Sequence, residues 1–162
     1  MDAANFRFDH PLGPIYGWFT ADGLSRLRLP GTTPRRRLAL LHSSANDHRV
    51  WALHAALERY FAGLREDFAA IPIDLVRHTP FRQTVWEAAR AVPWGDTSTY
   101  GELARRIGNP KAARAVGQAL GANPVPILVP CHRFLAAGGG LGGFSAGLHW
   151  KRELLRVEGL HA

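Results

Sequence analysis

A single cysteine in a proline-rich stretch is the side chain of this sequence best suited to covalent chemistry. Cys131 ends a stretch with three prolines in seven residues and precedes His132 and Arg133. Cationic or hydrogen-bonding neighbours lower the pKa of a thiol and so raise its thiolate fraction. A lone cysteine is, however, commonly a buried apolar side chain, and neighbours in an extended segment point to opposite faces. The pattern makes Cys131 a candidate nucleophile without placing His132 against it.

Two further features lie between the cysteine and the end of the chain. Six of the ten residues 138–147 are glycine, which is typical of a flexible linker but also lets backbone groups approach a planar ligand closely. Apolar residues at helical spacing then predict a helix from Leu148 to Glu158, with Glu158 beside the apolar stripe. Such an acid usually lies on an exposed flank. If it is buried, it needs a partner such as His132.

The stretch before the cysteine predicts two short helices around a turn. Thr99 and Glu102 fit a capping box that opens a helix ending near Ile107. After a turn at 108–110, a second helix is predicted from Lys111 to about Leu120, with Gly121 as its stop. This helix has unusually small side chains, which suit close packing against either a protein helix or DNA. The pair suggests a helix-turn-helix, although many helical hairpins bind nothing.

The first half of the sequence predicts a small sheet with one helix. Alternating or apolar runs predict strands at 6–8, 15–19 and 24–29, although Leu24 is one residue out of phase, and a hairpin turn lies at 21–23. An apolar stripe predicts a helix from Asp47 to about Gly63, and residues 71–76 read as an edge strand. A helix opened by Thr79 and Pro80, with Phe81, Val85, Trp86 and Ala89 on one face, follows. We therefore place a boundary between subdomains 1–78 and 79–162.

Composition and charge narrow the possible functions. The 162 residues, 46% of them hydrophobic, suit one compact domain or two small ones, and one cysteine excludes internal disulfides and Cys-rich metal sites. Without a long apolar run or a signal-like N-terminus, we expect a soluble cytoplasmic protein that needs no membrane.

The net charge is +1 over residues 1–76 and +6 over residues 77–162. This excess of positive charge favours a polyanionic partner, but a solvated basic surface is the simpler interpretation. The run Arg35-Arg36-Arg37 allows the same two interpretations, a nucleic-acid contact or a solvated surface.

Five short motifs, which occur along the chain in the same order as in a known family, give the sequence its resemblance to that family. They are Asn-Pro-Val-Pro at 123–126, Pro-Cys-His-Arg at 130–133, Arg-Ala-Val-Gly at 114–117, Gly-Gly-Phe-Ser at 142–145 and Lys-x-x-Leu-Leu-x-x-Glu-Gly at 151–159. The chain resembles the O6-alkylguanine-DNA alkyltransferases, closely over residues 79–159 and loosely over 6–76. The resemblance implies an α+β fold, with a ribonuclease-H-like N-terminal sheet and helix and a mostly helical, winged-helix-like C-terminal subdomain that carries the helix-turn-helix.

The resemblance also implies roles for the residues of the reaction. Cys131 is the nucleophile that takes the alkyl group irreversibly, so each molecule reacts once and needs neither cofactor nor metal. His132 is the base, acting through a water, and Glu158 orients its imidazole. Asn123 braces the DNA-binding and active-site segments, and Tyr100 is the general acid for the departing guanine.

The implied partner is duplex DNA containing O6-alkylguanine, with the damaged nucleotide flipped out and the protein acting as a monomer without an obligate protein partner. Arg114 fills the vacated place in the base stack. The implied DNA contacts are Lys111, Ala113, Arg114, Gly117 and Arg133, and the implied pocket residues are Pro126, Phe134, Gly142, Phe144 and Ser145. In a cell, such a protein is associated with the nucleoid when it is bound to DNA.

Two other functions compete with this one. A lesion-flagging relative without alkyl transfer is disfavoured because such proteins lack the cysteine that this chain keeps. A helix-turn-helix transcription regulator would leave Pro-Cys-His-Arg and Glu158 unexplained. Two departures from the family pattern bear on the pocket: Phe134 stands where valine is usual, and Ala146 where glycine is frequent.

Overall fold

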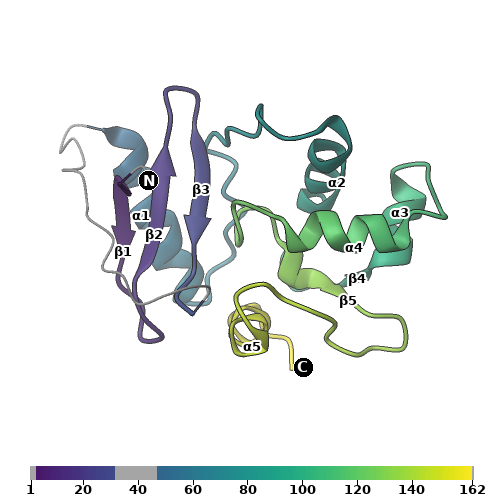
Figure 1. Ribbon diagram of the computed structural model, residues 1–162. Helices are drawn as coiled ribbons and strands as arrows, with labels where there is room; N and C mark the ends of the chain where they lie inside the picture. Colours follow the sequence, from purple (N-terminus) through teal and green to yellow (C-terminus); the bar gives the residue numbers. More distant parts are fainter. Residues whose placement is uncertain (1–2, 32–46, 162) are drawn as a thin grey trace.

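The computed structural model describes residues 3–31 and 47–161, so the run Arg35-Arg36-Arg37 lies outside the described residues. Two lobes lie side by side (Figure 1). The N-terminal lobe has an antiparallel sheet in the order β1-β2-β3, covered by α1; the bounds are β1 Phe6–Phe8, β2 Ile15–Phe19, β3 Leu24–Arg28 and α1 His48–Phe61. The C-terminal lobe contains α2 Pro80–Arg90, β4 Ser98–Thr99, α3 Tyr100–Arg106, α4 Ala113–Gly121, β5 Phe134–Leu135 and α5 Leu148–Val157. The expected α+β class is confirmed.

A bulge in β3 explains why Leu24 is out of phase with the rest of its strand. Trp18 pairs with Arg26, but Phe19 pairs with Leu24, so Ser25 is an extra residue on β3. The extra residue returns Leu24 to the buried face of the sheet. The Ser25 hydroxyl donates to the Trp18 carbonyl oxygen at 3.0 Å, which holds the bulge in place.

The strand predicted at 71–76 does not form, and this prediction was wrong. Only an isolated parallel bridge joins Ile73 to Leu24, with hydrogen bonds from Leu24 N–H to the Pro72 oxygen and from Asp74 N–H to the Leu24 oxygen. Pro72 has no N–H to extend a ladder. The segment also passes very close to the hairpin, because a Cβ on Gly23 would lie 2.6 Å from the Pro72 oxygen.

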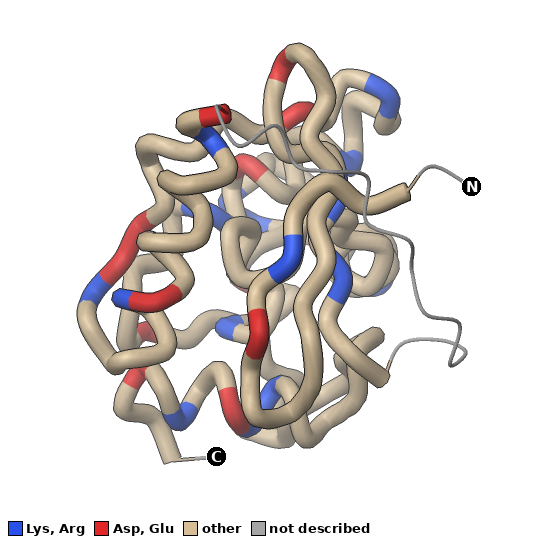
Figure 2. The backbone as a smooth tube through the Cα atoms, turned by 90° about the vertical axis from the view of Figure 1, so that its left-hand side faces the viewer, with Lys and Arg blue, Asp and Glu red and all other residues tan. Residues whose placement is uncertain are grey.

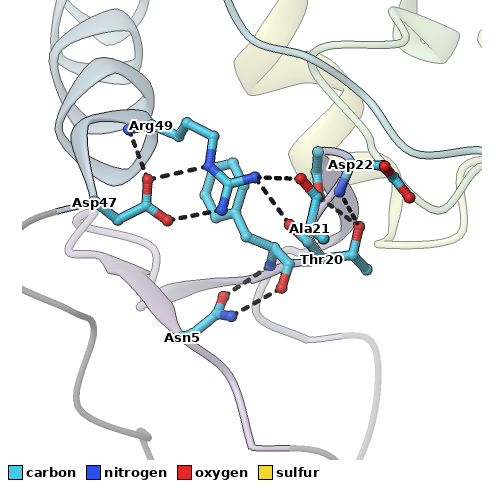
Figure 3. Close-up of polar contacts among 8 residues, drawn as sticks. Asn5, Thr20, Ala21, Asp22, Asp47 and Arg49 are labelled. Carbon is cyan, nitrogen blue, oxygen red and sulfur yellow. Dashed lines mark hydrogen bonds and ion pairs between the residues drawn. The ribbon is translucent and has the colours of Figure 1, made fainter.

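Polar contacts attach the start of α1 to the sheet (Figure 3). Asp47 is the N-cap and accepts from the Arg49 N–H, while its carboxylate also pairs with the Arg49 guanidinium at 2.9 Å. The same guanidinium donates to the carbonyl oxygens of Thr20 and Ala21 in the β2–β3 turn. The side chain of Asn5 adds two bonds to the backbone of the last residue of β2. The helix is thereby fixed over the sheet.

The helix-turn-helix is present, with a later start for its second helix than predicted. The capping box at Thr99 and Glu102 forms as expected. Helix α4, however, begins at Ala113, because the Ala112 N–H closes a turn onto Asn109, and Lys111 therefore precedes the helix. The helix also includes Gly121, which was predicted to stop it.

Helix α2 begins at Pro80 with Thr79 as its N-cap, as predicted. Val85, Trp86 and Ala89 are buried, but Phe81, which was expected on the same face, is 37% exposed. The Trp86 indole donates to the Ala119 oxygen at 2.8 Å and so ties α2 to α4.

Two apolar cores meet at the junction of the lobes. One lies between the sheet and α1 and includes Trp150 and Leu154 of α5; the other lies among α2, α3 and α4 and includes Cys131. Helix α5 therefore packs into the core of the N-terminal lobe, although it follows the predicted boundary. The Leu27 N–H also donates to the Pro124 oxygen across this junction.

Seen from the side of the N-terminal lobe, basic and acidic residues are interspersed along the backbone (Figure 2). Within the described residues, no helix is long and apolar enough to cross a membrane.

Candidate active site

Cys131 lies at the wall of a cavity of about 600 Å³ in the C-terminal lobe. The thiol is only 8% exposed and opens the short 3-10 turn Cys131–Arg133. The segment 123–133 forms turns with one isolated bridge between Pro126 and Val129. The cavity is lined by Tyr100, Ala113, Arg114, Gly117, Gln118, Leu120, Gly121, Cys131, Gly143, Phe144 and Ser145.

Asn123 braces the turn that carries the thiol, as the resemblance implied. Its amide nitrogen donates to the Val129 oxygen at 2.9 Å and lies 3.1 Å from the Cys131 sulfur. Its amide oxygen accepts from the Val125 N–H at 2.9 Å. One side chain thus fixes the backbone on both sides of the bend and supplies a donor to the sulfur.

Burial dominates the acidity of the thiol. It raises the pKa of Cys131 to about 11, against the smaller lowering effects of the Asn123 donor and the Lys151 charge. At neutral pH the side chain is a thiol, so a base must take its proton before it can attack an alkyl carbon.

His132 and Glu158 form a fully buried pair. The His132 Nε2 lies 2.6 Å from a carboxylate oxygen of Glu158. Burial would raise the pKa of Glu158, but His132 and Arg133 outweigh it and lower that pKa to about 2. Burial lowers the pKa of His132 below its ordinary value. Because Arg133 alone supplies a full positive charge, Glu158 stays ionised beside a neutral imidazole.

This pairing selects the tautomer of His132. A carboxylate accepts hydrogen bonds, so Nε2 must carry the proton and Nδ1 must carry a lone pair. Among the described residues, Nδ1 of His132 is the buried side-chain nitrogen or oxygen that has no hydrogen-bond partner. A buried, unpaired lone pair one residue from Cys131 is the arrangement that a general base requires.

Arg133 does not lie at a DNA-binding surface, and that prediction was wrong. Its side chain is buried, pairs with both oxygens of Glu158 at 2.9 Å and donates to the Val92 oxygen at 2.6 Å. The buried carboxylate of Glu158 holds the guanidinium inside the protein, where it cannot reach a phosphate.

Lys151 holds the glycine-rich loop, a role that the sequence analysis did not assign. Its side chain is fully buried, and its ammonium donates to the backbone oxygens of Phe134, Leu141 and Gly143. Three carbonyl groups from two segments therefore converge on one cation next to the cavity. A lysine within an apolar helical stripe was the signal available in the sequence, since such a lysine needs a buried partner.

The predicted pocket residues do not all line the cavity. Phe144 and Ser145 do, together with Tyr100, which was predicted to be the general acid. Phe134 does not, because its ring is fully buried in the C-terminal core, so its extra bulk over valine lies outside the cavity wall. Pro126 instead lines a neighbouring cavity of about 230 Å³ that shares Phe144 and Ser145.

Gly142 is also absent from the cavity lining, but it shapes the site indirectly. Its backbone has a φ of +70°, and a Cβ there would lie 2.7 Å from the Tyr100 hydroxyl. The glycine therefore allows the loop to pass against the phenol.

Of the residues predicted to contact DNA, Ala113, Arg114 and Gly117 of α4 line the cavity. Arg114 is exposed. Lys111 is exposed in the turn before α4 and does not line the cavity. In the described ranges, no group of three or more His, Cys, Asp or Glu side chains is placed to hold a metal ion.

Comparison with known proteins places this site in a family. Residues 80–160 match the family model for the 6-O-methylguanine DNA methyltransferase, DNA binding domain. A methylated-DNA–protein-cysteine methyltransferase of Methanosarcina acetivorans is 38% identical over 154 residues, which cover 94% of this chain and 96% of that protein. The chain belongs to the methylated-DNA–protein-cysteine methyltransferase family.

The Haemophilus influenzae member is 52% identical over 103 residues, which are 64% of this chain and 57% of that protein. The crystal structure of Mycobacterium tuberculosis OGT in complex with DNA superposes with a TM-score of 0.81 at 40% identity, covering 94% of this chain and 90% of that chain. As a methyltransferase of this family, the protein is a DNA-binding transferase of DNA repair.

The raised pKa of Cys131 predicts the pH dependence of its alkylation. With a pKa of about 11, the rate of reaction with iodoacetamide should rise with unit slope from about pH 7 to about pH 9.5, because the thiolate fraction grows tenfold per pH unit. Mass spectrometry of the intact protein measures the rate. The same chain unfolded in urea should reach half of its maximal rate near pH 8.5. A half-maximal rate near that pH in the folded protein would contradict the prediction.

Removal of the Lys151 ammonium should loosen the glycine-rich loop. Lys151→Met keeps the apolar stem but leaves the carbonyls of Phe134, Leu141 and Gly143 without their donor, at a cost of about 2–3 kcal/mol in the free energy of unfolding. Urea unfolding and thermolysin cleavage within 138–147 measure the two effects. Lys111→Met, at the exposed lysine of the chain, is the matched control and should change neither. Equal behaviour of the two variants would refute the tethering role.

Proposed function

We propose that the protein repairs O6-alkylguanine in duplex DNA by transferring the alkyl group directly and irreversibly to Cys131. The observation that carries the proposal is the unpaired Nδ1 of buried His132, next in sequence to a thiol that lines a cavity with Tyr100 and Ser145. The thiol needs a base, and an unused lone pair is available in the adjacent residue.

The transfer is a displacement at the alkyl carbon. The sulfur of Cys131 forms a bond to that carbon while the bond between carbon and guanine O6 breaks, and guanine leaves with the electron pair. The thiol proton passes through a water to Nδ1 of His132, and Glu158 stabilises the imidazolium that forms. The product is a thioether, which no ordinary leaving group can reverse, so each protein molecule acts once. We also propose that the protein acts as a monomer.

Tyr100 is suited to neutralise the charge on the departing guanine. Burial raises the pKa of its phenol, and the nearby Cys131 raises it further, so the group remains a proton donor at neutral pH. It lines the same cavity as Cys131. A positioned phenol can then donate to a guanine ring nitrogen as the charge develops.

Duplex DNA is the substrate that suits the surface around the cavity. Ala113 and Gly117 give α4 a narrow profile where it lines the cavity, and the exposed Arg114 lines the same cavity. A narrow helix fits the minor groove, and an arginine can take the place of a nucleotide that has flipped out. The +6 charge of residues 77–162 favours phosphates without reading their sequence.

The decisive experiment is to incubate the protein with a duplex oligonucleotide containing O6-methylguanine and to measure the intact mass. One methyl group should appear on Cys131, with one DNA lesion repaired per protein molecule and no turnover. Cys131→Ser should bind the duplex with unchanged affinity and gain no mass, because a hydroxyl is too weak a nucleophile.

The same experiment separates the competing functions. A wild-type protein that binds the lesion but gains no mass would favour the lesion-flagging function. Preference for one palindromic sequence, with indifference to the methyl group, would favour a transcription regulator.

Arg114→Ala tests the role of α4 in base flipping. The variant should lose about tenfold or more in the rate of transfer from duplex DNA, because the vacated stack is no longer filled. Transfer from the free base O6-benzylguanine, which needs no flipping, should be unchanged. Arg152→Ala removes the same charge from an exposed position on α5 and serves as the control. A loss shared by the duplex and the free base would rule out this role.

A further inference from the structure

A tyrosine of the N-terminal lobe reaches into the active site. Tyr60 lies near the end of α1, and its side chain is fully buried. Its hydroxyl donates to the Oε1 of Glu158 at 2.9 Å and lies 3.4 Å from the Nε2 of His132. Edge contacts with the rings of Phe61 and Trp94 fix the phenol ring. The phenol is therefore held on the pair of His132 and Glu158 by ring packing from both lobes, with Phe61 from α1 and Trp94 from the turn after α2.

The carboxylate oxygen that receives the phenol is crowded. Oε1 of Glu158 accepts from Tyr60, from His132 Nε2 at 2.6 Å and from Arg133 Nη2 at 2.9 Å. A carboxylate oxygen has two lone pairs, so three donors compete for it. The bond from Tyr60 must draw electron density from the bond to His132.

We propose that Tyr60 is a positioning residue, which shares Glu158 with His132 and thereby limits how strongly the carboxylate stabilises the imidazolium. This inference rests on the proposed role of His132 as the base. It gives the N-terminal lobe a part in the chemistry besides support.

The other groups around the pair do not compete for this role. Arg133 and Lys151 are the cations that face it, and both lower the pKa of His132 by their charge. The Gly95 N–H reaches the other oxygen of Glu158 at 3.5 Å. Burial raises the pKa of Tyr60 well above its ordinary value, with a further contribution from the Glu158 charge, so the phenol remains a donor over the whole working pH range.

The test is the pH dependence of the methyl-transfer rate in Tyr60→Phe. Without the phenol, Glu158 is a stronger acceptor for His132, and the imidazole gains protons at higher pH. The rate falls when His132 is protonated, so the acidic limb of the profile should move up by roughly 0.5 to 1 pH unit. Removal of the phenol also removes its 3.4 Å approach to His132, which would move the limb in the opposite direction. The 2.6 Å hydrogen bond between His132 and Glu158 outweighs that longer contact.

Tyr16→Phe is the matched control, because Tyr16 lies on β2 and its phenol makes no contact with the pair. Its profile should superpose on that of the wild type. The affinity of Tyr60→Phe for methylated duplex should stay within twofold of the wild type. The inference is overturned if the acidic limb of Tyr60→Phe stays in place or moves down. It is also overturned if the rate falls equally at every pH with a lowered melting temperature, since that result indicates a structural role alone.

The same series separates this inference from the proposed function. If the wild type gains no methyl group at any pH, the proposed function fails. If the wild type reacts with a clear acidic limb and Tyr60→Phe reacts with the same limb, only the role of Tyr60 fails.

Discussion

A carboxylate that is removed from water costs several kcal/mol unless charges and donors surround it, and Glu158 imposes that requirement at the centre of this fold. Its partners come from three segments of the chain. His132 and Arg133 arrive with the cysteine turn, Tyr60 with α1 of the other lobe, and Gly95 with the turn after α2. The two lobes must dock correctly before the carboxylate is satisfied. The charge that pairs with His132 is therefore satisfied only when the two lobes have assembled correctly.

Local patterns predicted most of the elements, and the failures lie where distant segments decide the structure. The capping box at Thr99 and the start of α2 depend on residues within one turn, and both were predicted correctly. The segment 71–76 has the composition of a strand, but only Leu24 pairs with it and Pro72 cannot donate. The bulge at Ser25 was visible only as a leucine out of phase.

The candidate site shows the same division. The motif order located Cys131, His132, Asn123 and Glu158, which the fold brings together. The sequence could not tell in which direction Arg133 points, because that depends on a carboxylate 25 residues away. The roles of Lys151 and Tyr60 depend on groups that meet only in the folded chain. Residues that act through tertiary contacts are the ones that single-sequence reasoning misses.

The raised pKa of Cys131 also affects the protein in its unreacted state. Oxidation of cysteine by peroxide proceeds through the thiolate and yields a sulfenic acid that can no longer attack a carbon. A buried thiol with a pKa of about 11 is almost entirely protonated at neutral pH, and so it is a poor target for peroxide. Under the proposed single, irreversible transfer to Cys131, this resistance preserves the thiol for damaged DNA.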